Sequence, residues 1–134
     1  MNHKKINFEK LHGFYFEELK VGMWDLFSKT ITSADIVLYS GISGDTNPIH
    51  LDKNFAKNTI FKGCVSHGML TASLISTVIG TKMPGPGCIY VNQSLQFKGP
   101  VRAGDTVTAM AKIKKVIQTK NLVELRTTCF IDDT

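Results

Sequence analysis

The amino-acid sequence predicts an α+β domain in which an antiparallel sheet encloses one long helix. Three observations lead to this fold class: one strand-like segment early in the chain, a strongly apolar helical segment in the middle, and alternating strand-like segments in the last third. A helix that is apolar on nearly every side must be buried, and a curved sheet can cover it. The chain has 134 residues, 43% of them hydrophobic, so we expect residues 1–134 to form a single domain.

The first strand leads directly into the first helix. Residues 23–31 carry the apolar side chains expected of a strand. Thr32 or Ser33 can cap a helix that should run over residues 34–41. Asp35 falls in its first turn, where a carboxylate interacts favourably with the positive end of the helix dipole. The sequence therefore predicts a strand followed by a capped helix.

Two further helical segments follow. Asp52 can cap a short helix in which Phe55 and Ala56 face inward. Residues 66–80 place apolar side chains around most of a helical wheel, which is typical of a buried helix. Gly80 is suited to end this helix as its C-cap. This long helix is the element that the sheet must cover.

The last third of the chain has the period of strands. We expect strands over residues 89–97, 106–119 and 122–131. Gly104-Asp105 and Lys120-Asn121 are suited to turns, the second of them within a hairpin. These segments therefore predict an antiparallel meander after the long helix.

Composition and charge narrow the classes of partner. The net charge of +5 is compatible with nucleic acid, a membrane surface or an anionic small molecule. The basic residues are dispersed without interleaved aromatic residues, so no nucleic acid partner is expected. Neither a secretory signal nor an apolar stretch suited to membrane insertion is found in the sequence. We expect a soluble protein.

Cysteine usage indicates a reducing compartment. The chain has three cysteines, Cys64, Cys88 and Cys129, which lie far apart and form no CxxC pair. Neither a disulfide framework nor a zinc ribbon is indicated by this spacing. A cytoplasmic location fits best.

The segment from Tyr39 to His50 is the first candidate for chemistry. Asp45 and His50 lie on a stretch that Gly44 and Pro48 mark as a loop. Such a loop can aim a carboxylate and an imidazole at one point, as general acid-base catalysis requires. Taken alone, Asp45 is an ordinary turn residue and His50 an ordinary core histidine. Their combination on one loop favours catalysis.

A second candidate lies at the start of the long helix. The missing side chain of Gly68 leaves a backbone N–H open to a ligand, although a glycine early in a helix needs no function. His67 could join Asp45 and His50 as metal ligands. The spacing of these residues does not enforce a metal site, and no metal is expected.

The run from Tyr39 to Asp52, followed by Phe55-Ala56, resembles the hydratase-2 motif of the MaoC-like dehydratase family and its (R)-specific enoyl-CoA hydratases. The resemblance continues through Ser66–Leu70, Pro84–Gly87 and Ile89–Phe97, and so covers nearly the whole chain. It implies a hot-dog fold, in which the sheet wraps the long helix. It also implies a homodimer whose sheet continues across the interface, or a higher homo-oligomer.

The resemblance further implies reversible addition of water to a trans-2-enoyl thioester of coenzyme A, giving the (R)-3-hydroxyacyl thioester without a cofactor. Asp45 and His50 would activate the water and transfer protons. The N–H of Gly68 would bind the enolate oxygen. The residues expected to contact the substrate or brace the loop around it are Asn47, His67, Met69 and Ser76. For Ser76, a hydroxyl bonded to its own helix is an equal alternative.

The phosphates of coenzyme A give the positive charge a use. The candidate cations at the mouth of the site are Lys62, Lys82, Lys98 and Arg102. Two other functions remain open: a dehydratase or hydratase that acts on acyl-carrier-protein or unusual acyl thioesters, and a non-catalytic acyl-CoA-binding module. The non-catalytic binding module is disfavoured, because binding alone does not require an acid and an imidazole on one loop.

One departure from the family pattern concerns the end of the chain. Members of the family usually continue into a final strand, whereas Ile131–Thr134 resembles a hairpin turn. We therefore expect the C-terminal strand to be missing. An unpaired sheet edge promotes association.

Overall fold

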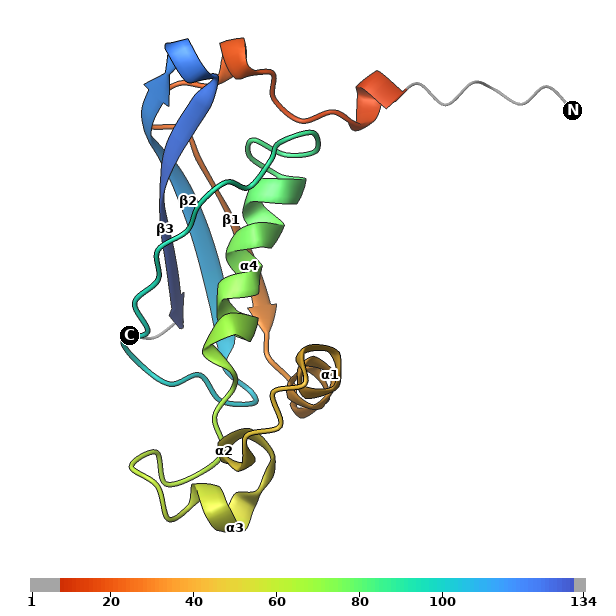
Figure 1. Cartoon of the computed structure of the whole chain (residues 1–134), viewed down its shortest axis with the longest axis vertical. Coiled ribbons are helices and arrows are strands. Elements are labelled where there is room, and N and C mark those ends of the chain that lie inside the picture. Colours follow the sequence, from red (N-terminus) through yellow and green to blue (C-terminus); the bar gives the residue numbers. More distant parts are fainter. Residues whose placement is uncertain (1–7, 132–134) are drawn as a thin grey trace, which may run out of the picture.

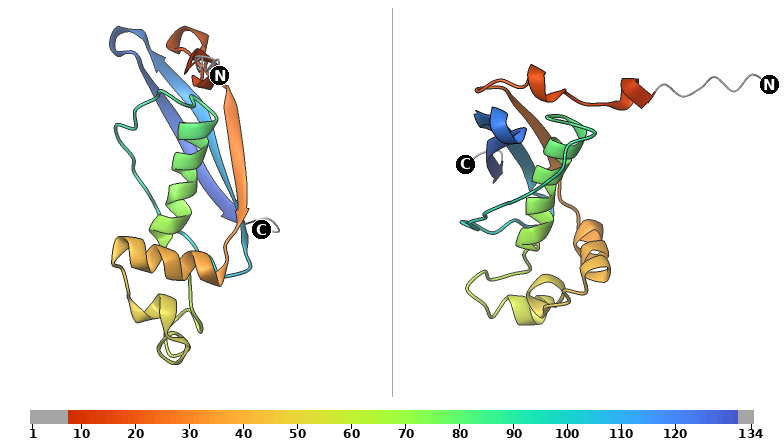
Figure 2. Two further views of the ribbon diagram at one scale, coloured as in Figure 1. Left: turned by 90° about the vertical axis from the view of Figure 1, so that its right-hand side faces the viewer. Right: turned by 45° about the horizontal axis from the view of Figure 1, so that its top comes forward.

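The computed structural model describes residues 8–131, and its centre is one long helix that lies across a three-stranded antiparallel sheet (Figures 1 and 2). The strands are β1 (Trp24–Thr30), β2 (Thr106–Ile117) and β3 (Leu122–Ile131), and the helices are α1 (Ser33–Ser43), α2 (Pro48–Leu51), α3 (Lys53–Ala56) and α4 (Gly68–Thr81). Short 3-10 helices span Phe8–Leu11, Phe16–Glu18 and Gln118–Lys120. The predicted α+β class is confirmed.

The sheet has the order β1-β2-β3, with both pairs antiparallel. Trp24 pairs with Lys112 at one end of the β1-β2 ladder. β2 and β3 form a hairpin, in which Asn121 takes the left-handed conformation with φ of 50°. Asparagine tolerates this conformation better than most residues, so the turn expected at this position is confirmed.

The core lies between α4 and β2. One face of α4 buries Leu74, Ile75, Val78 and Ile79, and β2 presents the buried residues Val107, Ala109 and Ala111 on its inner face. The two alanines let the helix approach the sheet closely. The opposite face of α4, with Ser73, Ser76 and Gly80, is exposed in the described chain. The sheet therefore covers one side of the helix here, instead of nearly all of it.

The strand expected over 89–97 is the largest correction. The segment forms no strand ladder, and Ile89 is 85% exposed. A groove of about 940 Å³ separates its first half from β3, and the segment reaches β3 through the side chains of Gln93 and Thr127, 3.2 Å apart. The alternation of the sequence is that of a strand, but a strand also needs a hydrogen-bonding neighbour.

Two smaller expectations also fail. Gly80 lies inside α4, and the C-cap is Lys82, because the helix continues to Thr81. Phe55 is exposed, whereas Ala56 is fully buried, since α3 is a single turn that can bury only a small side chain there. Asp52 caps this turn as expected. The expectation of a missing final strand concerns residues outside the described part of the chain.

Two composition-based expectations can be compared with the described residues. Cys64, Cys88 and Cys129 are free thiols. Burial raises the pKa of the Cys129 thiol and so disfavours its reactive thiolate form. Within residues 8–131, no helix combines the length and the apolar character needed to cross a membrane.

The capping of α1 fixes the path of the chain toward the candidate loop. The Thr32 hydroxyl accepts a hydrogen bond from the Asp35 N–H at 3.1 Å, and the Asp35 carboxylate accepts one from the Thr32 N–H at 2.8 Å. Lys29 lies 2.9 Å from the same carboxylate. The Thr32 N–H, the Lys29 ammonium and the Thr32 hydroxyl, in that order of size, lower the pKa of Asp35 to about 2. The two reciprocal hydrogen bonds between Thr32 and Asp35 form a capping box.

Asp35→Asn tests the capping box through its pH dependence. The pKa of Asp35 lies below its usual value of 3.8, so the ionised group stabilises the folded protein above about pH 4, and this contribution is lost as the pH falls through about 2. We expect the variant to have the lower urea midpoint at pH 7 and the difference to shrink below pH 4. Urea unfolding of both proteins at a series of pH values measures it. A difference that does not change with pH contradicts the assignment.

Candidate active site

The loop after α1 fixes the Asp45 carboxylate through its own backbone. Gly44 has a φ of 77° and ends α1 in the left-handed conformation. One carboxylate oxygen of Asp45 accepts a hydrogen bond from the Asn47 N–H at 3.2 Å. The Asn47 side chain in turn caps α2 by accepting from the Ile49 N–H at 3.1 Å. The other oxygen of Asp45 is left facing His50, which stands in the last turn of α2.

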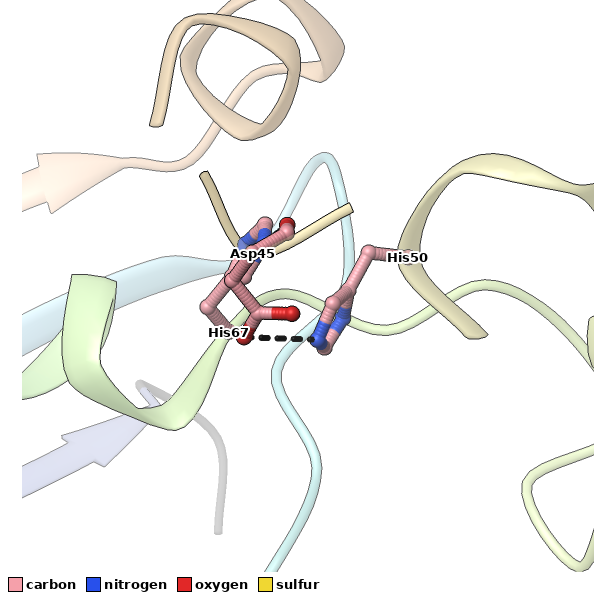
Figure 3. A group of neighbouring side chains, drawn as sticks. All are labelled: Asp45, His50 and His67. Atoms are coloured by element: carbon pink, nitrogen blue, oxygen red, sulfur yellow. Dashed lines mark hydrogen bonds and ion pairs between the residues drawn. The ribbon is translucent and has the colours of Figure 1, made fainter. Parts of the chain in front are cut away.

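His50 presents one defined nitrogen to this carboxylate. Its Nδ1 lies 2.7 Å from the carbonyl oxygen of Val65, and because a carbonyl can only accept, Nδ1 carries the proton. The other ring nitrogen, Nε2, therefore faces Asp45, with Nε2 and Oδ2 3.9 Å apart (Figure 3). A water molecule at hydrogen-bond distances of about 2.8 Å can touch both atoms. The His50 side chain is 11% exposed and that of Asp45 53% exposed.

His67 joins this loop to the long helix. Its Nε2 lies 2.9 Å from the backbone carbonyl oxygen of Asp45 and 3.2 Å from the Ser40 hydroxyl. Its ring stacks on that of His50, with centroids 3.7 Å apart and an interplanar angle of 30°. The two landmarks found in the sequence are therefore one site.

The side chains of Asp45, His50 and His67 meet the distance condition for a metal site, since one ligand atom from each lies within 4.8 Å of the others. The orientation of the rings opposes joint coordination. Imidazole nitrogens bind metals in the ring plane, and the lone pairs of two stacked rings do not converge on one point. Each ring also has a nitrogen at hydrogen-bond distance from a carbonyl oxygen. The arrangement suits proton transfer better than metal binding.

The N-terminus of α4 opens into the same cleft. His67 is the N-cap residue, but its side chain makes no capping hydrogen bond. The backbone N–H groups of Gly68 and Met69, the first two residues of the helix, have no acceptor within it. These N–H groups lie at the positive end of the helix dipole. This end of α4 can therefore bind a negatively charged oxygen.

The cleft has a volume of about 740 Å³ and collects most of the predicted site residues: Asp45, Asn47, His50, His67, Gly68 and Met69. Ser76 does not line this cleft and is exposed two turns further along α4. Asn47 acts on the loop itself, because its carboxamide oxygen caps α2. The predicted residues are thus brought together with the exception of Ser76.

Residues that sequence reasoning missed also line the cleft. Thr71 has a buried hydroxyl without a hydrogen-bond partner in the described chain. Its spacing of one helical turn from His67 was a usable signal. The Phe97 ring covers Gly68 so closely that a Cβ atom there would lie 2.7 Å from it. No local sequence pattern connects Phe97 with Gly68, because the two residues lie far apart in the sequence.

The four candidate cations have different surroundings. Lys98 lines the cleft. The Arg102 guanidinium donates hydrogen bonds to the carbonyl oxygens of Cys64, at 3.2 Å, and Phe61, so it holds a loop in place. Lys82 follows the far end of α4, with its Nζ 3.8 Å from an Asp25 oxygen. Lys62 is exposed. Of the four, Lys98 is the one at the cleft.

The fold and the site together define a hot-dog domain with an acid and an imidazole at the start of its central helix. Residues 25–132 match the family described as MaoC like domain, and the chain belongs to this family. It is 51% identical over 117 residues to an (R)-specific enoyl-CoA hydratase of Rhodospirillum rubrum, and the aligned region covers 87% of this chain and 81% of the relative. It is 43% identical over 124 residues to a 3-hydroxybutyryl-CoA dehydratase of Methylorubrum extorquens, covering 92% and 79%.

A solved structure supports the same fold. The (R)-hydratase from A. caviae involved in PHA biosynthesis superposes with a TM-score of 0.83 at 41% identity, over 86% of this chain and 87% of that one. The family resemblance and the hot-dog fold expected from the sequence are confirmed.

A glycine pair in α4 tests the contact between Gly68 and Phe97. Gly68→Ala pushes a Cβ into the Phe97 ring, whereas Gly80→Ala meets nothing within 4 Å. We expect the first change to lower the free energy of unfolding by about 1–3 kcal/mol and the second to raise it by about 0.5–1 kcal/mol. Urea unfolding measures both. Adding Phe97→Ala should remove the clash from the Gly68→Ala protein, and equal stability of the two alanine variants argues against the contact.

Proposed function

We propose that this protein catalyses the reversible hydration of trans-2-enoyl-CoA to (R)-3-hydroxyacyl-CoA. The observation that carries the proposal is the facing pair of Asp45 Oδ2 and His50 Nε2, 3.9 Å apart, beside the open N-terminus of α4. Acid-base groups and an anion-binding helix end are the two parts that addition of water to a conjugated thioester requires. The similarity to an (R)-specific enoyl-CoA hydratase and to a 3-hydroxybutyryl-CoA dehydratase supports the same reaction class.

The catalytic water binds between the two side chains. Its oxygen bonds to C3 of the substrate as the carboxylate of Asp45 and the imidazole of His50 accept one proton. The same pair returns a proton to C2, so the elements of water are added across the double bond. The Nδ1–H bond to Val65 keeps the His50 ring in the orientation and tautomer that this step needs.

The N-terminus of α4 stabilises the charge that forms during addition. When oxygen attacks C3, electron density moves onto the thioester oxygen. The Gly68 N–H and the helix dipole bind this oxygen, and one preorganised donor of this kind contributes about 3 to 4 kcal/mol. Residue 68 has no side chain, and the Phe97 ring packs into the space that a Cβ would take. Met69 and Thr71 line the cleft beside it.

Coenzyme A is the proposed carrier of the acyl group. The net charge of +5 suits its phosphates, and Lys98 is the cation at the cleft. A panel of acyl groups on coenzyme A and on acyl carrier protein, with chiral analysis of the product, separates this carrier from the alternative.

The working form that we propose is a homodimer. Apolar side chains are exposed along α1, where Val37, Leu38 and Ile42 face outward, and in the unpaired segment that contains Ile89 and Val91. Exposed apolar groups at several positions of one segment are typical of an interface. A second copy of the chain would remove them from water.

The proposed cellular setting is the cytoplasm. The cysteines are free thiols, as a reducing compartment requires. Acyl-CoA metabolism in such a compartment would supply the substrate. Fractionation of cells that produce the protein tests this location.

Asp45→Asn and His50→Gln test the catalytic pair. Each removes one group that accepts the proton from water, so we expect kcat to fall by about 10²- to 10⁴-fold. Loss of the conjugated-enoyl absorbance of crotonyl-CoA measures the rate. Asp52→Asn is the matched control, because Asp52 caps α3 and asparagine caps helices equally well. Folded wild-type protein that binds acyl-CoA thioesters but hydrates none of them refutes the proposal.

Sedimentation equilibrium tests the homodimer. We expect twice the mass of one chain at micromolar concentration. Val91→Lys places a charge on an exposed apolar position and should shift the distribution toward the monomer. Lys53→Glu, an exposed change on α3, is the control. A wild-type protein that stays monomeric at all concentrations rules the dimer out.

A further inference from the structure

We propose that His67 is a positioning residue, which holds the Asp45 loop against the start of α4 and leaves that helix start uncapped. This inference rests on the proposed function and adds a residue to its machinery. It replaces the expectation that His67 contacts the substrate.

The surroundings of His67 are those of a structural donor. The side chain is 2% exposed, and its Nε2 lies 2.9 Å from the carbonyl oxygen of Asp45. The carbonyl can only accept, so Nε2 carries the proton and donates it to this oxygen. The Ser40 hydroxyl, 3.2 Å from the same nitrogen, is a second partner. The bond holds the backbone of the residue that carries the catalytic carboxylate.

The position of His67 in the helix is the second argument. At the N-cap, serine, threonine, aspartate and asparagine are preferred, because their side chains accept a hydrogen bond from the N–H of the second or third helical residue, here Met69 or Leu70. His67 has the extended backbone of an N-cap residue, with φ of −60° and ψ of 133°, but its side chain makes no capping bond. The imidazole reaches back to Asp45 instead. The Met69 N–H, which a capping side chain could take, is thereby left beside that of Gly68 for the thioester oxygen.

The contact between the two imidazoles is the third argument. The His67 ring stacks on His50, and one edge of His50 is fixed by the Val65 carbonyl. The stack limits rotation of His50 out of the plane in which its Nε2 faces Asp45. His67 therefore contacts both parts of the catalytic pair. It donates a hydrogen bond to the backbone of Asp45, and its ring stacks on the ring of His50.

Two substitutions separate the hydrogen bond from the stack. His67→Gln keeps a side-chain N–H the same number of bonds from Cβ as Nε2, but has no ring. His67→Phe keeps a ring but has no donor. If the bond to Asp45 is the main contribution, we expect kcat on crotonyl-CoA to fall about 10- to 100-fold in the phenylalanine variant and within about threefold in the glutamine variant, with KM little changed. Ser40→Ala, which removes the other partner of Nε2, should leave kcat within about threefold.

Equal losses of kcat in both His67 variants, in proportion to a loss of thermal stability, assign the residue to packing alone and overturn the inference. Unchanged kcat in the phenylalanine variant also overturns it. Two-bond nitrogen-proton spectra of the imidazole rings give a readout that needs no turnover. We expect the His67 Nε2 to carry a proton, and a ring with its proton on Nδ1 and none on Nε2 overturns the inference. An inactive wild type with the expected tautomer instead refutes the proposed function and leaves the role of His67 intact.

Discussion

The site depends on hydrogen bonds from imidazole N–H groups to main-chain carbonyl oxygens. Asp45 and His67 are 22 residues apart in the sequence, and the bond between His67 and the Asp45 carbonyl joins them. The hydrogen bond from His50 to the Val65 carbonyl oxygen joins α2 to the segment that precedes α4. A carbonyl oxygen can only accept, and each imidazole supplies the donor while fixing its own tautomer. Two loops without a strand or long helix of their own thus acquire a defined geometry.

The core determines where this geometry is placed. Ala109 and Ala111 on β2 allow α4 to lie close to the sheet, and the buried face of the helix sets its rotation. The start of α4 then has a fixed position relative to the sheet. Because Ser66 donates a hydrogen bond to the Val101 carbonyl at 2.6 Å, the segment before the helix is anchored as well. Packing far from the chemistry therefore decides where the N–H of Gly68 lies.

Sequence reasoning recovered what local patterns encode. The capping signals at Thr32 and Asp52 located two helices, and the hairpin at Asn121 was found from its turn residues. The Asp45 and His50 pair was found because the two residues are five positions apart in a segment that Gly44 and Pro48 mark as irregular, although His50 stands in the short helix α2 and not on a loop. The unpaired state of 89–97 could not be predicted, because its alternation says nothing about whether a neighbouring strand is present. Phe97 over Gly68 and the stacking of His67 on His50 are contacts between distant segments, which periodicity cannot reveal.

The uncapped start of α4 also bears on attempts to improve the protein. A redesign that ranks substitutions by folding free energy would favour serine or aspartate at residue 67, since a good N-cap contributes about 1 kcal/mol. Such a cap can bond to the Met69 N–H, which lies at the cleft beside that of Gly68. Thermostability and turnover would then compete for this donor, so screens for hardier variants should hold this position fixed.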